Sequence, residues 1–209
     1  MQSKSRSTNR GSSLFRKVAL AILPALLLAG SASARTIPTA QPFPLGFSVF
    51  APVQFPLSDV DVNGFRLSIV YGHHNNVMGL DIGALVSAAD GDVFGLEVSG
   101  LVNIVGSSSG AVQVAGIANN SYEDFCGCQI AGIANRTGGL LQGGQIGCFN
   151  MAGDMSGIQI GVYNKAASAT GLQIGVVNET TSMQGIQIGL INMIREGALP
   201  FFPIVNMSF

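Results

Sequence analysis

The chain has 209 residues, of which 10% are charged and 28 are glycine, with a formal net charge of −1. So few charges exclude a solvated, disordered chain, and the glycines lack the period of three that collagen requires. Of the 10 basic residues, 5 lie in residues 1–34, so the remainder carries 5 basic against 11 acidic residues. That balance argues against nucleic acid as a partner, because such binding calls for a basic stripe.

Residues 1–34 have the pattern of a secretory signal peptide. A basic start leads into the apolar run Val18–Ala29, and the small residues Ala32, Ser33 and Ala34 follow as a cleavage pattern. A membrane anchor is the alternative. It is disfavoured because the run is short and Pro24 interrupts it.

Residues 35–63 form a lead-in that is rich in proline and phenylalanine. Proline is poorly tolerated inside a sheet, yet the phenylalanines make this segment apolar. An apolar but irregular segment is expected to cover something. We predict a cap over the first repeat, which open-ended arrays need; the alternative is a docking peptide for a partner.

Residues 64–195 form a repeat array. The best copies, residues 157–164, 171–178 and 185–192, share the pattern Gly-x-Gln-Ile-Gly-x-x-Asn at a spacing of 14. Looser copies extend the Gln column backward, with charged residues in its first three positions: Arg66, Asp81, Glu97, Gln113, Gln129, Gln145, Gln159, Gln173 and Gln187. The longer units place one more residue between the Gln and Asn columns, as a bulge would. Such periodicity predicts a stacked array.

Within each unit, apolar and polar positions alternate. Ile158, Ile160 and Val162 share one parity, while Gln159 and Gly161 have the other. Alternation with period two over so short a run predicts a strand, and the small polar residues that follow predict a turn. Residues 196–209 are expected to be an altered closing unit, with prolines that blunt the sheet edge.

Two all-β architectures fit this pattern. The first is a β-solenoid of about 14–16 residues per coil, in which like residues stack on like. It predicts a structural ladder made of an interior apolar column (Ile146, Ile160, Ile174, Ile188) and a corner column (Asn150, Asn164, Asn178, Asn192).

The second architecture is an antiparallel up-and-down β-barrel of the outer membrane, which the terminal Phe209 favours. The chain has no Trp and 3 Tyr, so it lacks the expected aromatic girdles. Its turns are uniform, and its strands are slightly short for a membrane crossing. The solenoid is therefore the first prediction.

The repeat together with the ending Leu199–Asn206 resembles the bacterial surface-repeat-containing proteins. The segments Gly64–Leu67 and Tyr71-Gly72 add to the resemblance. It implies an exported protein of the envelope or surface and no known reaction. The chain departs from that pattern in its cysteines and in the charged start of its Gln column.

No group of residues makes a convincing site. Cys126, Cys128 and Cys148 allow one disulfide and a free thiol, or simple packing, and no second cluster completes a metal site. Asp81 and Glu97 are interpreted as a solvated face. The adjacent residues His73 and His74 are interpreted as part of a turn. Residues 106–110 match a nucleophile elbow in letters only, because no histidine follows them. We therefore expect no catalytic residues, no metal and no cofactor.

The prediction is an exported structural or interaction protein of the bacterial cell envelope or surface, without catalytic activity. The alternative is a small outer-membrane barrel that acts as a channel or an anchor. The partner is unknown: envelope or surface components fit, nucleic acid does not, and association with a membrane stays open.

Overall fold

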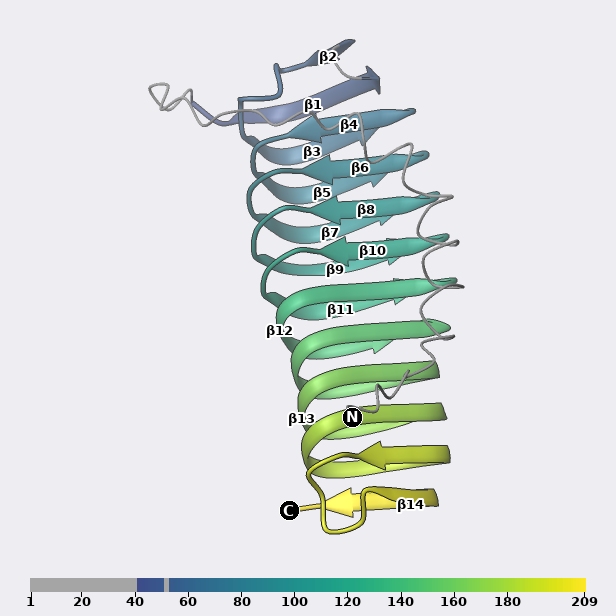
Figure 1. The fold of residues 1–209 in the computed structure, drawn as a ribbon. Helices are drawn as coiled ribbons and strands as arrows, with labels where there is room; N and C mark the ends of the chain where they lie inside the picture. Colours follow the sequence, from purple (N-terminus) through teal and green to yellow (C-terminus); the bar gives the residue numbers. More distant parts are fainter. Residues whose placement is uncertain (1–40, 51–52) are drawn as a thin grey trace, which may run out of the picture. The chain divides into compact units, whose positions relative to one another are not determined.

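The computed structural model describes residues 41–50 and 53–209, all of which belong to one compact unit, Thr39–Phe209. The predicted signal peptide, residues 1–34, lies outside the described residues. Every element in the described part of the chain is a β-strand (Figure 1). No helix with the length and hydropathy of a membrane span occurs in that part.

Each coil consists of a long strand, a corner, a short strand and a second corner. The long strands are β3 (Val62–Ser68), β5 (Val77–Gly83), β7 (Val93–Ser99), β9 (Ser109–Ala115) and β11 (Phe125–Ala131). The short strands are β4 (Tyr71–His74), β6 (Val86–Ala89), β8 (Val102–Val105) and β10 (Ala118–Ser121). Long strands pair with long strands and short with short, always in parallel. The chain is therefore a β-solenoid, and this parallel register excludes the antiparallel alternative.

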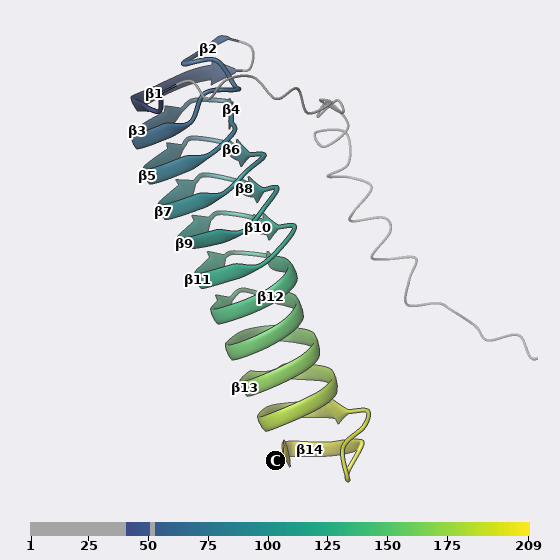
Figure 2. The same cartoon turned by 90° about the vertical axis from the view of Figure 1, so that its left-hand side faces the viewer.

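The later coils are shorter and nearly free of breaks. β12 (Ala134–Ile146) and β13 (Phe149–Ile194) continue through the corners (Figure 2). Their side-chain ladders repeat every 14 residues instead of 16. In the longer coils the extra residue between the columns lies in the corner after the long strand, for example at Gly116-Ile117. It is therefore part of a turn and not the predicted bulge.

Glycine at the start of the repeat is required by close backbone approach. Gly157 has a φ of 144°, and a Cβ there would lie 1.9 Å from the carbonyl oxygen of Gly143 in the coil before. Equivalent glycines in neighbouring rows adopt the same left-handed conformation. This stacking explains why the repeat begins with glycine.

The lead-in and the closing unit each add strands to one end of the array. β1 (Phe43–Phe50), from the lead-in, pairs in parallel with β3 and carries β2 (Val53–Phe55) as an antiparallel neighbour. β14 (Phe201–Ser208) runs antiparallel to the last part of β13. Asn206 follows Asn192 by 14 residues, the spacing of the Asn column, but this reversal places Asn206 opposite Gln187 and so outside that column.

The interior contains the Gln column and not the Ile column. Gln145, Gln159, Gln173 and Gln187 have no exposed surface, whereas Ile146 and Ile188 are 41% and 40% exposed. The predicted interior column of Ile146, Ile160, Ile174 and Ile188 is therefore wrong, since all four lie on the outer surface of the long strands. The reason is the corner: two consecutive residues, such as Val162 and Tyr163, both point outward there, so the alternation changes parity before Asn164.

An apolar column accompanies the buried amides. It stands at the start of the long strands, where Val77, Val93, Phe125, Leu141 and Met155 are at most 2% exposed. Small side chains such as Ala89 and Ala166 complete the core from the short strands. The interior of each coil is therefore half apolar and half polar.

Candidate functional site

The outer surface of the long strands is apolar over the height of the array. We call it the apolar face and define it by two adjacent outward columns. One column contains Phe65, Leu80, Leu96, Val112, Cys128, Gly144, Ile158, Leu172 and Ile186. The other contains Leu67, Ile82, Val98, Val114, Ile130, Ile146, Ile160, Ile174 and Ile188.

Both ends of the array extend the apolar face. Leu45 and Phe47 of β1 lie in register with Phe65 and Leu67, and they are 59% and 46% exposed. At the other end Ile204 of β14 lies beside Gly189 and is 69% exposed. Exposed apolar surface of this extent is unusual on a soluble monomer and marks an interaction surface.

The apolar face is hollowed near its C-terminal end. A groove of about 560 Å³ lies between the Ile column and the corner residues Val176 and Leu190, and Ile204 closes it. Its floor includes Gly175, where a Cβ would lie 2.6 Å from the amide nitrogen of Asn164. Glycine in the floor therefore follows from the packing of the Asn column beneath it.

The buried glutamines form a continuous ladder of side-chain hydrogen bonds. Each Nε2 donates to the Oε1 of the row before it, with distances of 2.7 to 2.9 Å from Gln129 to Gln187. Hydroxyl groups of Ser121, Thr137 and Thr180 add bonds from the short strands. Since buried amides must find partners, this ladder is what makes a polar interior stable.

The asparagines form a second ladder in the opposite direction. Asn150, Asn164 and Asn178 each donate from Nδ2 to the Oδ1 of the next row, and the ladder ends at Asn192. The same Nδ2 atoms donate to backbone carbonyls, for example Asn164 to Ile174 at 2.8 Å. All four residues have no exposed surface, so the structure places them in the interior at the corner.

Opposed directions leave one unpaired acceptor at an end of each ladder. The Gln ladder donates toward the N-terminal rows, and Gln187 Oε1, at its far end, has no partner among the described atoms. The Asn ladder donates toward the C-terminal rows, and Asn103 Oδ1 is left in the same way. The aligned amide dipoles of the two ladders therefore oppose each other along the stack.

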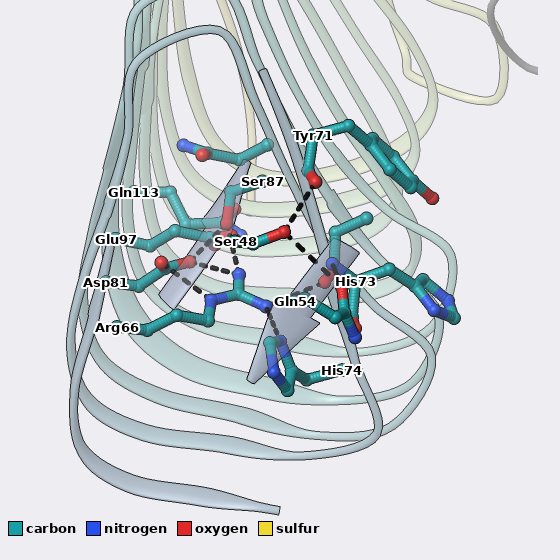
Figure 3. A network of polar contacts seen from close by, with 12 residues as sticks. Ser48, Gln54, Arg66, Tyr71, His73, His74, Asp81, Ser87, Glu97 and Gln113 are labelled. Carbon is teal, nitrogen blue, oxygen red and sulfur yellow. Dashed lines mark hydrogen bonds and ion pairs between the residues drawn. The ribbon is translucent and has the colours of Figure 1, made fainter. Parts of the chain in front are cut away.

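Charged residues replace the Gln ladder in the first rows. Arg66 and Asp81 are 0% and 1% exposed and form an ion pair through two hydrogen bonds, one of them Arg66 Nε to Asp81 Oδ1 at 2.7 Å (Figure 3). Arg66 also donates to Ser87 and to the carbonyl of Ala88, and its Nη1 lies 3.3 Å from His74 Nδ1. The interpretation of Asp81 as part of a solvated face is therefore wrong.

Glu97 joins this cluster to the Gln ladder. It is fully buried and accepts a hydrogen bond from Gln113 Nε2 at 2.6 Å, so it too is not part of a solvated face. Burial, together with the nearby Asp81 carboxylate, raises the pKa of Glu97 to about 8. At neutral pH this carboxyl group is therefore mostly protonated, which avoids a second buried negative charge beside the ion pair.

His74 is a buried residue of β4 and not part of a solvated turn. Burial and the neighbouring Arg66 guanidinium lower the pKa of His74 to about 4, so the imidazole is neutral at pH 7. His73 points to the other side of the strand, where its Nε2 lies 2.9 Å from Asp90 Oδ1. The cluster of Arg66, Asp81, Glu97 and His74 is closed to solvent, which argues against a catalytic role.

On the outside of the described coils from β3 onward, the charged side chains lie on the short strands and in the corners that follow them. An open groove of about 420 Å³ there is lined by Arg136, Lys165, Glu179 and Arg195, among others. Glu179 accepts hydrogen bonds from Tyr163 at 2.6 Å and from Arg195 at 2.5 Å, and Lys165 lies 3.5 Å away. Its carboxylate thus contacts two of the three cations and neutralises one of their charges.

The three cysteines are free thiols near the middle of the array. Cys128 belongs to the apolar face, Cys126 lies beside it on the same strand, and Cys148 is in a corner. Within residues 41–50 and 53–209, no group of three or more His, Cys, Asp or Glu side chains is placed to hold a metal ion. No protein-family model, no curated protein and no solved structure matches the chain.

Proposed function

We propose that this chain is an exported structural or interaction protein of the bacterial cell envelope or surface, without a catalytic role, and that it binds through the apolar face. The observation that carries the proposal is the uninterrupted apolar surface from β1 to β14. A monomer that kept this surface in water would lose the free energy that its burial provides, about 25 cal/mol per Å².

Two sequence features support the envelope as its location. Residues 1–34 have the pattern of a secretory signal peptide, and the repeat with its ending resembles bacterial surface-repeat-containing proteins. The alternative, a channel or anchor made of antiparallel strands, has no support in the parallel register of the coils. Nor does any solvent-accessible set of catalytic groups favour an enzyme among the described residues.

Cell fractionation tests the proposal. Bacteria that express the tagged chain should hold it outside the cytoplasm, in a form that has lost residues 1–34 and begins at Arg35. The matched control is the same chain expressed without residues 1–34, which should stay in the cytoplasm. An uncleaved full-length protein in the cytoplasm would refute the proposal. Release of the envelope fraction by carbonate is expected, since binding through one face of a sheet is peripheral.

A further inference from the structure

The apolar face also indicates what covers it. We propose that the occupant is a second copy of this chain, packed face to face, with a two-fold axis that runs parallel to the stacking direction between the two columns. This inference rests on the proposed function, because it names the partner of the same surface. In this arrangement each row lies opposite the same row of the other copy.

The size of the apolar face suits a dimer. Rows are about 4.8 Å apart and residues about 3.3 Å apart along a strand, so the two columns, extended by β1 and β14, cover roughly 700 Å². Stable interfaces bury about 800 Å² per partner, and the largest apolar patch on a typical monomer is about 300–600 Å². Sheets that pack face to face bury such surfaces at a separation of about 10 Å.

The charge distribution favours self-association. Neither column of the apolar face contains Asp, Glu, His, Lys or Arg, so two copies bring no like charges together. The acidic residues gather on one edge, in corners after the short strands, such as Asp90, Asp92, Glu123 and Asp124. A two-fold axis along the stack puts these edges on opposite sides of the dimer, whereas an axis across the stack would place them together.

The shape of the central rows fits the same axis. One column has small residues at Cys128 and Gly144, which leave a depression, while the adjacent column has the large side chains of Ile130 and Ile146. The proposed axis sets each column against the other column of the second copy. Ile130 and Ile146 then fill the depression at Cys128 and Gly144, and the symmetry makes this fit reciprocal.

Sedimentation of the exported protein in detergent-free buffer tests the dimer. At ten micromolar we expect twice the mass of one chain. Ile130→Asp should raise the dimer dissociation constant at least 100-fold, because it buries an unpaired carboxylate in the interface. The matched control is Ile104→Asp, an outward residue of β8 on the opposite surface, which should leave the dimer intact.

A second variant guards against a folding defect. Gly144→Asp should dissociate the dimer equally, and a Cβ at Gly144 meets only ordinary contacts, the nearest at 3.4 Å from Ile158. Circular dichroism should show unchanged strand content for both variants, and unchanged melting at concentrations where the unmodified chain is also a monomer.

Three outcomes would overturn the dimer: a monomer at all concentrations, a dimer broken only by Ile104→Asp, or a monomer that binds phosphatidylglycerol vesicles through the apolar face. The last would make lipid the occupant. A monomer that is still exported would leave the proposed function standing. A dimer that never leaves the cytoplasm would refute the proposed function and leave the dimer standing.

Discussion

The interior position of the Gln column is occupied in two ways, by ionisable groups in the rows of Arg66, Asp81 and Glu97 and by amides from Gln113 to Gln187. A guanidinium only donates hydrogen bonds and a carboxylate only accepts them, so the first region needs a closed set of complementary partners. An amide does both. Each amide row therefore satisfies the row before it, and the second region can be extended coil by coil.

The difference has a structural consequence at the junction. The Gln ladder needs an acceptor where it ends toward the N-terminus, and Glu97 supplies one to Gln113. At its other end Gln187 Oε1 finds no such partner among the described residues. The charged rows thus act as a fixed end of the polar interior, while the amide rows form its repeating part.

Arg66→Met should have the largest effect on stability, because it leaves Asp81 buried without its counter-ion. Breaking a buried pair by removing one partner costs about 3–5 kcal/mol. Urea unfolding followed by circular dichroism measures the loss. The control is Arg136→Met on the exposed surface, which should cost well under 1 kcal/mol. Similar losses for the two arginines would mean that the ion pair with Asp81 does not stabilise these rows.

In the amide region, Gln173→Leu should be the more damaging of two neighbouring changes. It removes the donor to Gln159 and the acceptor of Gln187, at a cost of about 2 kcal/mol. Ile174→Thr on the apolar face should cost less than 1 kcal/mol in the unassociated chain. Melting temperatures below the association threshold compare the two. A larger loss for Ile174→Thr would mean that the Ile column faces the interior, as the sequence predicted.

That reversal separates what the sequence can predict from what it cannot. The coil length, the strands and the stacking of like residues follow from the period of the Gly, Gln and Asn columns, and the solenoid was predicted correctly on that basis. The repeat does not say which parity faces inward. The rule that apolar residues lie inside places Ile160 in the interior, and that rule fails when identical amides pair between coils.

The corners explain why the sequence pattern alone does not show which residues face inward. Gln159 and Asn164 are five residues apart, yet both point inward, because two outward residues lie together in the corner between them. The burial of Arg66 and Asp81 follows from the column alone. The same position holds Gln in six rows and Arg66, Asp81 or Glu97 in the other three, so if it faces inward in six rows it faces inward in all nine. The same column predicts the apolar face as well: if the Gln side points inward, the Ile side of each long strand must point outward.

The pH dependence of stability should report the junction between the two regions. The pKa of Glu97 is raised from 4.5 to about 8, so the folded chain holds one more proton than the unfolded chain between these values, and stability falls as pH rises. The pKa of His74 is lowered from 6.5 to about 4, so between these values the unfolded chain holds one more proton and stability rises as pH rises. We therefore expect a plateau from about pH 4.5 to 6.5, where the two cancel, and a decline from 6.5 to 8.

Glu97→Gln tests this assignment, because an amide cannot titrate. The decline between pH 6.5 and 8 should disappear from urea midpoints measured across that range. Below pH 6.5 the contribution of His74 should then be seen alone, as a stability that falls with falling pH. The exposed control is Glu123→Gln, which should leave the profile unchanged. An unaltered decline in Glu97→Gln would assign the titration to another group.

The smallest expected effect is the coupling between two rungs of the Asn ladder. Asn164 Nδ2 donates to Asn178 Oδ1 at 2.8 Å, so Asn164→Ala and Asn178→Ala should not be additive. A double-mutant cycle should give a coupling free energy of about 1 kcal/mol.

The control is the pair Asn164 and Asn192, which stand in the same column two rows apart and share no hydrogen bond. Their losses should add within about 0.5 kcal/mol. Coupling of equal size in both pairs would show that the rows communicate through the backbone of the array, and that the amide contact contributes nothing of its own. Coupling in the adjacent pair alone would show that the ladder itself links one coil to the next.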